Sequence, residues 1–457
     1  MNQAMLRLCP IFQGGYVSSV GVKLTLEWDV PPEDFLFKLA ENTVGKALLP
    51  FSAPPVLRDA AGELPYTVRT VQDDKIVWQE YLASRLVSGP LALSYDVVLE
   101  KVGKNPAFDL GFEENGMNGS GMTFLPELSA GRWQADVDWD LTKMPSGSSG
   151  VWSYGEGHTR QEISEKGLAQ TFYAAGDLQS VREGRCGFFW LPDSAFPGRE
   201  VGTFVLSLYR RMAEFFRDGD APFNVISRRL PAALTGRNGM GGIALDRSFL
   251  FVYNGENPPD TETLKFLFPH EIVHNWITMD DTPFGSCTWY VEGMAEYYSV
   301  VLPDRFGMIS RRQLLTQMNK RARDYYENPR LTVTNAWAGE HLFHDGEATL
   351  VPYGRGFFYL LHMDGVIRKA TAGQKCLDDV MFALLDQNRA GQLTTNEDWL
   401  RQLSAVTGVD GEREFCEMQN GAVFAPEIGS LVTPPRIVKT QGTTRETGAP
   451  CTLYQFE

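Results

Sequence analysis

The first third of the chain alternates hydrophobic and polar positions with the period of a β-strand. Residues 23–30 and 132–139 show this alternation, and residues 91–99 are apolar and rich in strand-forming side chains. Side chains two positions apart share one face of a strand. In the second segment the hydrophobic face would consist of Trp133, Ala135, Val137 and Trp139. The pattern predicts an N-terminal β domain.

Near residue 170 the pattern changes to a mixture of strands and helices. We expect strands at 186–191 and 223–230, one further strand through 242–253, and a helix over 201–217. Two helices should follow, at 262–277 and 290–302, the second stopped by Pro303. Pro269 lies within the first of these helices, so this helix either begins there or is kinked.

The remainder of the chain has mainly helical periodicity. Residues 310–326, 354–368 and 377–385 are the clearest helices, and the tail from Pro434 resembles a loop. A chain of 457 residues exceeds the size at which one core stops growing. We therefore predict a multidomain α+β protein divided into residues 1–168, 169–308, 309–430 and a tail at 431–457.

Composition and charge narrow the possible partners. The formal charge of −15 opposes binding to nucleic acid or to an anionic membrane surface. No apolar run reaches the length of a membrane span, and the N-terminus lacks the apolar stretch of a secretory signal. We expect a cytoplasmic protein, although a chain trimmed of its signal would look the same. The six cysteines form no CxxC pair, so the sequence indicates no cysteine zinc site.

The motif HExxH is the strongest chemical signal in the sequence. It places His270 and His274 one helical turn apart, so both imidazoles project from one face toward a single ion. Glu271 lies beside them as a candidate general base. An HExxH sequence also occurs by chance on amphipathic helices. A catalytic zinc site usually has three protein ligands, so a third ligand must come from elsewhere.

Glu292 is the candidate for that third ligand. It follows His274 after seventeen residues and begins a second helix, which a turn could bring antiparallel to the first. The alternative is a solvated carboxylate at a helix start, which the helix dipole favours. Glu296 lies one turn further on the same face and could hydrogen-bond a ligand imidazole. Imidazole with carboxylate suits one Zn²⁺ per chain best, and cobalt or manganese could occupy the same set.

At these residues the sequence resembles the gluzincin zinc metallopeptidases, in particular the glycyl aminopeptidase family, which is related to the membrane-alanyl-type aminopeptidases. Three segments carry the resemblance: 269–276 (PHEIVHNW), 289–298 (WYVEGMAEYY) and 352–361 (PYGRGFFYLL). Their order and spacing also agree, over roughly residues 170–400. The resemblance implies an N-terminal β-sandwich, a thermolysin-like α/β catalytic domain and a helical C-terminal region. It implies an aminopeptidase acting on peptides with small N-terminal residues.

The resemblance also assigns a role to Tyr353. Its hydroxyl would stabilise the oxyanion of the tetrahedral intermediate, while Glu271 takes a proton from the attacking water and returns it to the leaving amine. The alternative for Tyr353 is a buried aromatic at a helix start. A non-catalytic protein that kept a structural metal would need neither residue, so their presence argues for an enzyme.

Residues 240–246 (MGGIALD) resemble the strand that runs along the substrate in these families. Gly241, Gly242, Ala244 and Asp246 are the candidate substrate-binding residues. Ala244 stands where the family has a glutamate that grips the substrate amine, and Asp246, two residues later on the expected strand face, is the nearest carboxylate. This departure favours an alternative function, an endopeptidase or a non-peptide hydrolase of the same fold.

Two weaker features complete the sequence picture. His341 and His344, with Asp345, have a spacing that could bind metal, but without a third nearby ligand they are more often loop or helix-cap residues. The basic run 311–323 is typical of a solvated helix face. The expected partner is a peptide substrate, and the sequence gives no indication of oligomeric state.

Overall fold

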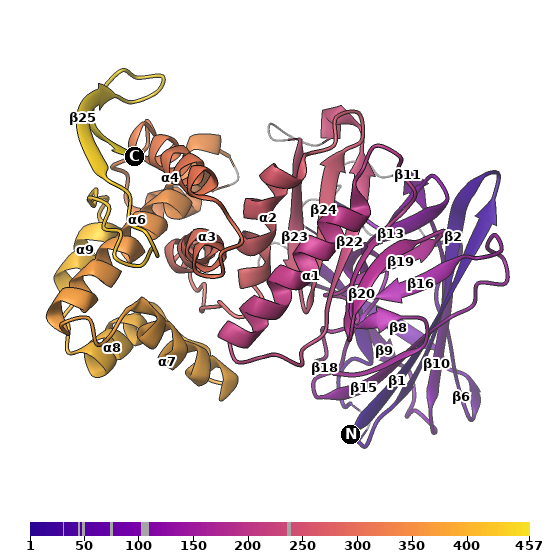
Figure 1. Cartoon of the computed structure of the whole chain (residues 1–457). Helices are drawn as coiled ribbons and strands as arrows, with labels where there is room; N and C mark the ends of the chain where they lie inside the picture. The colour runs from indigo at the N-terminus through magenta and orange to yellow at the C-terminus, as the bar shows by residue number, and fades with distance from the viewer. Residues whose placement is uncertain are drawn as a thin grey trace. The chain divides into compact units, whose positions relative to one another are not determined.

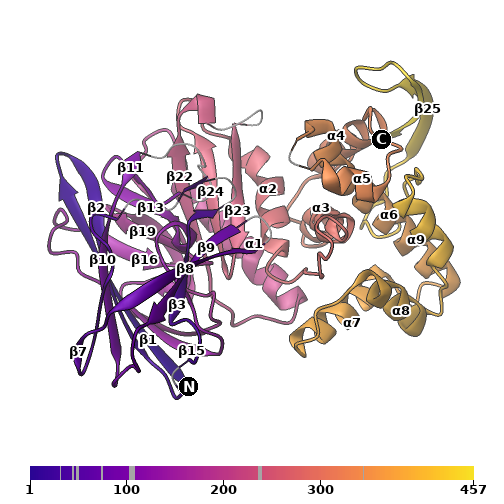
Figure 2. The same cartoon turned by 180° about the vertical axis from the view of Figure 1, so that it is seen from behind.

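The structure, a computed structural model, describes residues 1–457 except 31, 44–45, 48–50, 74–75, 102–108, 235–238 and 343. It consists of two compact units, seen from one side in Figure 1 and from behind in Figure 2. One unit comprises residues 1–209 and 220–261, and the other comprises 210–219 and 262–457. Sheets and helices both contribute, so the predicted mixed α+β class is confirmed. The predicted boundaries near 168, 308 and 430 stay a prediction.

In the described residues, the largest sheet of the first unit has seven strands; β1 and β15 pair in parallel, and the other neighbours pair antiparallel. β15 alternates as predicted, with its tryptophans, Ala135 and Val137 buried. The strand predicted at 23–30 begins earlier and ends at Glu27. In sheet order the strands are β18 (Thr159–Ile163), β15 (Trp133–Trp139), β1 (Asn2–Gln13), β2 (Tyr16–Glu27), β10 (Leu91–Val98), β6 (Val56–Asp59) and β7 (Gly62–Glu63).

Smaller sheets complete the β-rich part of this unit, and one large apolar cluster containing Trp133, Trp152 and Tyr173 forms its core. A six-stranded sheet contains β11 (Glu100–Lys101), β12 (Gly111–Glu113), β13 (Gly116–Ser120), β19 (Phe172–Gly176), β16 (Ser149–Trp152) and β17 (Gly155–Glu156). A four-stranded sheet contains β14 (Glu127–Leu128), β3 (Phe37–Ala40), β9 (Ile76–Ala83) and β8 (Tyr66–Asp73). β4 (Asn42–Thr43) pairs with β5 (Lys46–Ala47), and a short helix η1 spans Gly121–Thr123.

A five-stranded sheet follows in the chain, parallel in its centre and antiparallel at both edges. Its order is β20 (Gln179–Glu183), β21 (Cys186–Trp190), β22 (Phe223–Leu230), β24 (Ser248–Asn254) and β23 (Met240–Leu245), with α1 (Gly198–Phe215) and η2 (Ala232–Leu234) in its connections. The prediction of one strand through 242–253 is wrong. Leu245 pairs with Ser248 across a two-residue turn, in which Arg247 has a left-handed φ of 52°.

Helices dominate the second unit: α2 (Thr261–Val273), α3 (Thr288–Arg305), α4 (Arg311–Tyr326), α5 (Asn335–Glu340), α6 (Gly346–Ala370), α7 (Leu377–Arg389), α8 (Asn396–Thr407) and α9 (Glu412–Gln419). Trp289 of α3 lies in their core, where its ring meets those of Tyr359 and Trp399 edge to face at 5.4 and 5.6 Å. Its indole nitrogen also donates to Asn396 at 2.9 Å. These contacts tie α3, which carries Glu292, to α6 and α8.

Several helix bounds differ from the predictions: α2 ends at Val273 rather than at 277, and α7 continues to Arg389 rather than ending at 385. Pro269 lies inside α2, so the alternative in which the helix begins there is wrong. α3 continues past Pro303 to Arg305, because a proline in the last turn removes only one hydrogen bond. α6 begins at Gly346 rather than 354, because the carboxylate of Asp345 caps the backbone N–H groups of Glu347 and Ala348.

The C-terminal tail is not the predicted loop but a hairpin of β25 (Ile437–Thr443) and β26 (Pro450–Phe456). The side-chain amide of Asn319, on α4, donates to the Phe456 carbonyl at 2.9 Å and accepts from its N–H at 2.8 Å. Tyr454 also packs against Tyr326 of α4, with ring centroids 4.8 Å apart. Contacts with α4, which lies more than a hundred residues earlier in the chain, therefore fix the position of the hairpin.

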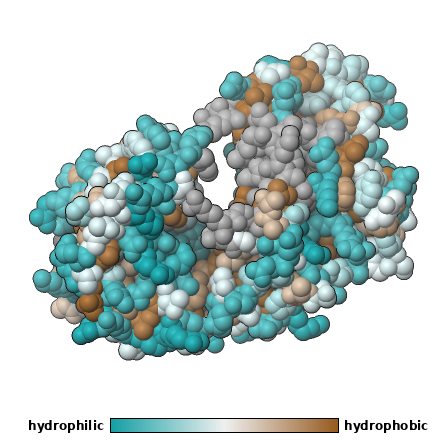
Figure 3. Space-filling view, turned by 90° about the horizontal axis from the view of Figure 1, so that it is seen from above, coloured by the Kyte–Doolittle hydropathy of each residue, from teal (hydrophilic) through white to brown (hydrophobic). Residues whose placement is uncertain are grey.

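The surface agrees with the composition. On the face shown in Figure 3, hydrophilic residues predominate and hydrophobic residues occur in small separate groups. Among the helices in the described residues, none combines the length and the apolar character that a membrane crossing requires.

Candidate metal centre

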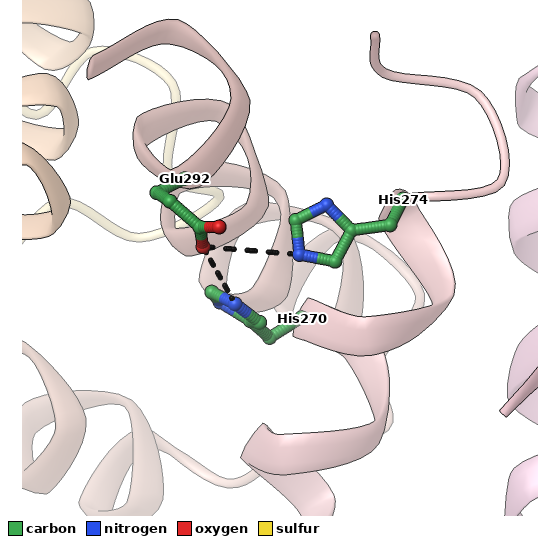
Figure 4. Close-up of side chains that lie close together, drawn as sticks. All are labelled: His270, His274 and Glu292. Carbon is green, nitrogen blue, oxygen red and sulfur yellow. Dashed lines mark ion pairs between the residues drawn. The ribbon is translucent and has the colours of Figure 1, made fainter. Parts of the chain in front are cut away.

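Three side chains of the second unit converge as the sequence predicts (Figure 4). His270 lies in the last turn of α2, His274 directly follows that helix, and Glu292 lies in α3. Glu292 Oε2 is 3.2 Å from His270 Nε2 and 3.8 Å from His274 Nε2. One ligand atom from each residue lies within 4.8 Å of the others. Two imidazole nitrogens therefore face a single carboxylate oxygen.

Contacts of Trp276 fix the chain just after α2, next to His274. The two histidine rings lie 5.1 Å apart at 81° to each other. Trp276, two residues after His274, stacks on Phe216 at 4.5 Å, and its indole nitrogen donates to Asp218 at 2.9 Å. The chain thus cannot unwind from His274 without breaking an aromatic stack and a hydrogen bond.

A tight reversal then brings α3 back toward the histidines. The carboxylate of Asp281 accepts hydrogen bonds from the backbone N–H groups of Gly285 and Cys287, at 2.9 and 3.0 Å. Gly285 has a φ of 86°, which favours glycine, and its Cα approaches Gly339. This turn lets Glu292 reach the histidines with only seventeen residues between it and His274.

The residues fit a divalent cation. Glu292 Oε2 is buried and makes no hydrogen bond of acceptable geometry with the described residues, although two imidazole nitrogens lie close to it. A buried carboxylate oxygen without such a partner is costly, and a cation held jointly by this oxygen and the two nitrogens removes the cost. Two imidazoles and one carboxylate form the donor set of catalytic zinc sites.

Glu296 lies where the sequence predicts a supporting carboxylate. Its Oε1 atom is 3.1 Å from His270 Nδ1, on the side of the ring opposite the cluster. Burial opposes ionisation of Glu296, but the adjacent charge of Arg321 and the close contact with His270 outweigh it and lower the pKa to about 2. A carboxylate in this position fixes the tautomer that presents Nε2 to a metal.

Burial sets the ionisation of the other groups. Burial, with a smaller contribution from the carboxylates of Glu292 and Glu296 and against the attraction of His270, raises the pKa of Glu271 to about 7. Burial also lowers the pKa of His274 to about 4, which favours the neutral imidazole that a metal requires. A carboxylate with a pKa near neutrality is suited to accept and return a proton.

Tyr353 lies beside the cluster, in the second turn of α6 rather than at a helix start. Its ring is parallel to that of His270, with centroids 5.8 Å apart. Burial and the negative charges of Glu292, Glu271 and Glu296 raise its pKa well above the ordinary value, so the hydroxyl keeps its proton. A protonated hydroxyl can donate to developing negative charge. The catalytic role of Tyr353 stays a prediction.

The candidate substrate-binding residues belong to the first unit. Gly241, Gly242 and Ala244 lie in β23, half-buried. The expectation that Asp246 shares a strand face with Ala244 is wrong, because β23 ends at Leu245 and Asp246 lies in the turn. Its carboxylate accepts a hydrogen bond from the hydroxyl of the buried Tyr154. The substrate-binding role of all four residues stays a prediction.

The second histidine pair does not form a metal cluster among the described residues, where the only group that qualifies is that of His270. His341 stacks on Trp337 at 3.9 Å and bonds its backbone carbonyl. Asp345 caps α6. The interpretation of these residues as loop and cap residues agrees with these contacts.

Arg321 lies in the basic run predicted to be a solvated helix face, and for this residue the prediction is wrong. Arg311 and Lys320 of that run are exposed, but the side chain of Arg321 is only 10% exposed and pairs with Glu296. The positions of the buried residues along α4 could have indicated that Arg321 is buried. Arg321 occupies a core position in the series formed with the buried Leu314, Met318 and Tyr325.

Comparisons with known proteins agree with this fold. No protein-family model and no curated protein sequence matches the chain. Three similar structures are an aminopeptidase N family protein from Idiomarina loihiensis (14% identity, TM-score 0.71, 97% of this chain and 79% of that one), an M1 zinc metallopeptidase from Deinococcus radiodurans (16%, 0.54, 95% of each) and LTA4 hydrolase from yeast (14%, 0.53, 95% and 68%). The likeness shows a shared fold.

Proposed function

We propose that this chain is a zinc-dependent peptide hydrolase whose metal is held by His270, His274 and Glu292. The convergence of these three side chains beside the buried Glu271 carries the proposal. The structures that share the fold support it, because two of those compared are described as an aminopeptidase N family protein and an M1 zinc metallopeptidase. A site that bound metal only to stabilise the fold would not require, next to its ligands, a carboxyl group whose pKa is raised toward neutrality.

In the proposed mechanism, bound zinc supplies the Lewis acidity that activates water and polarises the scissile carbonyl. Glu271 accepts a proton from the attacking water on its carboxylate and then delivers it to the leaving amine. The Tyr353 hydroxyl donates a hydrogen bond to the oxyanion of the tetrahedral intermediate. Glu296 holds His270 in the tautomer that leaves Nε2 free to bind metal.

We further propose that the chain is an aminopeptidase of the glycyl aminopeptidase type, which removes small N-terminal residues from peptides. The proposal includes the domain arrangement of that type: a β-sandwich, a thermolysin-like domain and a helical domain. One observation favours a second candidate, an endopeptidase or a non-peptide hydrolase of the same fold. The carboxylate of Asp246 is engaged by Tyr154, and Ala244 offers no charge for a substrate amine.

The test combines zinc content with hydrolysis of paired peptides, one with a free and one with an acetylated N-terminus. The wild type should bind one zinc and cleave, and Glu271→Gln should keep zinc and lose turnover. Glu262→Gln is a matched control, because Glu262 lies on the same helix but is 55% exposed and pairs with Lys265. Cleavage of the free peptide alone supports an aminopeptidase, and equal cleavage of both supports the second candidate. Turnover retained by Glu271→Gln would overturn the mechanism.

A further inference from the structure

Arg321 forms a buried link between α4 and the carboxylate that supports His270. Glu296 uses each of its oxygens for a different partner: Oε1 faces His270 Nδ1 at 3.1 Å, and Oε2 pairs with Arg321 Nε. The carboxylate plane is therefore held at both ends. Without Arg321, Oε2 would be a buried anionic oxygen short of a partner, free to rotate away from the histidine.

The guanidinium itself is fixed by the other two nitrogens. Nη2 donates to the hydroxyl of Ser299 at 3.0 Å, and Nη1 donates to Gln317 Oε1 at 2.9 Å. Ser299 is fully buried and donates to the Glu296 carbonyl at 2.8 Å, so it belongs to the same stretch of α3. The guanidinium therefore combines an ion pair through Nε with hydrogen bonds through both Nη atoms, an arrangement that suits arginine and not lysine.

The same side chain also lies against the helix that carries Tyr353. Its guanidinium carbon is 5.7 Å from the ring centre of Phe357, which lies one turn after Tyr353 on α6. Arg321 thus touches the two helices that bear the carboxylate ligand and the hydroxyl donor, α3 and α6. A position chosen only for solubility would not be 10% exposed and surrounded in this way.

We infer that Arg321 is a positioning residue for the metal centre, which holds Glu296 and through it orients His270 toward zinc. The inference rests on the proposed function. Among the described residues, the contacts of Arg321 are with Glu296, Ser299, Gln317 and Phe357 rather than with a metal ligand, so it acts through another residue. Its loss should weaken zinc binding more than it affects binding of substrate to the zinc-loaded enzyme, because its ion pair is with the carboxylate that supports His270.

The experiment measures the zinc dissociation constant by competition with a chelator for Arg321→Met, Arg321→Lys, Glu296→Gln and the double variant Glu296→Gln/Arg321→Met. Loss of a carboxylate that supports a ligand histidine weakens metal binding about 10-fold to 100-fold. We expect Arg321→Met and Glu296→Gln each to raise the zinc constant about tenfold or more. Arg321→Lys should raise it less. The double variant should be no weaker than the worse single variant, because both act through one link.

A matched control separates positioning from loss of stability. Arg305 also lies in a partly buried ion pair, with Asp378, and its side chain is 23% exposed. Arg305→Met should lower the melting temperature of the zinc-free protein but leave zinc affinity unchanged. With zinc saturating, Arg321→Met should regain the wild-type KM. Circular dichroism of the zinc-free variants confirms folding before affinities are compared, and Arg321→Lys keeps the test open if Arg321→Met does not fold.

A zinc constant unchanged in Arg321→Met, an additive loss in the double variant, or an equal loss in Arg305→Met would overturn the inference. These outcomes leave the proposed function standing, since the wild type would still bind zinc and hydrolyse peptide. A wild type that binds zinc with the expected dependence on Arg321 but cleaves no peptide supports the positioning role and overturns the hydrolase. A wild type that binds no zinc overturns both.

Discussion

Gly293 of α3 and Gly356 of α6 lie backbone against backbone. A Cβ atom added to Gly293 would lie 2.6 Å from the Cα of Gly356, and one added to Gly356 would lie 2.7 Å from the Cα of Gly293. Glu292 directly precedes the first glycine, and Tyr353 lies one turn before the second. The close crossing of two glycines therefore brings the carboxylate ligand and the tyrosine hydroxyl to the same place.

The first prediction concerns this crossing. Gly356→Ala should push the two helices apart, lower the free energy of unfolding by about 1–3 kcal/mol and weaken zinc binding. Gly346→Ala is a matched control on the same helix, because a Cβ there meets no atom within 4 Å, and it should leave both quantities close to wild type. Chemical denaturation and chelator competition measure the two effects. Equal behaviour of the two variants would show that the crossing does not position the site.

A second prediction concerns Tyr353→Phe. Loss of one donor to an oxyanion typically lowers kcat about 100-fold or more, so kcat should fall by this order while zinc stays bound. Tyr359→Phe, in the same helix, is the control. Its hydroxyl accepts from Trp399 at 3.2 Å, so this variant also loses a buried hydrogen bond, yet it should keep its kcat. Similar losses in both variants would mean that Tyr353 acts through stability alone.

The third prediction concerns removal of the metal. A ligand that binds only the folded state stabilises it by about 4 kcal/mol when present at a thousand times its dissociation constant. A chelator should therefore lower the melting temperature of the wild type, but not that of His274→Ala, which cannot complete the ligand set. His341→Ala should respond as the wild type does, since His341 lies against Trp337 and outside the cluster. A chelator effect that persists in His274→Ala would contradict the ligand assignment.

The parts of the site that follow from local geometry could be predicted from the sequence. Helical spacing alone places the imidazoles of His270 and His274 one turn apart, where both can face one ion. What could not be predicted depends on distant contacts. The pairing of Arg321 with Glu296 and the support of Phe456 by Asn319 join segments whose proximity no periodicity encodes.

The same distinction applies to the fold. Alternation in β15 correctly identified a buried strand face, and the bounds of β22 were predicted correctly. The prediction of a single strand through 242–253 was wrong because the turn at Asp246 and Arg247 contains no glycine or proline that would mark it in the sequence. Arg247 also adopts a left-handed conformation that few residues other than glycine take. The choice between extended strand and hairpin is then made by pairing with the neighbouring strand rather than by local preference.

The fourth prediction concerns pH and the zinc-free protein. Burial raises the pKa of Glu271 from 4.5 to about 7 in the folded chain, while in the unfolded chain the group is exposed and ordinary. Between these values the folded state binds more protons than the unfolded state. The contribution of Glu271 therefore favours folding at low pH and is lost as pH rises through about 7. A shift of this size corresponds to about 3 kcal/mol.

Glu271→Gln removes this dependence because glutamine does not ionise. With zinc chelated, the free energy of unfolding of Glu271→Gln minus that of the wild type should increase by up to about 3 kcal/mol from pH 5 to pH 8. Glu262→Gln, on the same helix but exposed, should keep a constant difference from the wild type over this range. Because no zinc is bound, the slope reports the burial of Glu271 separately from its catalytic role. A flat difference for Glu271→Gln would mean that the Glu271 carboxylate is hydrated in the folded protein, which would remove the basis for a base with a pKa near neutrality.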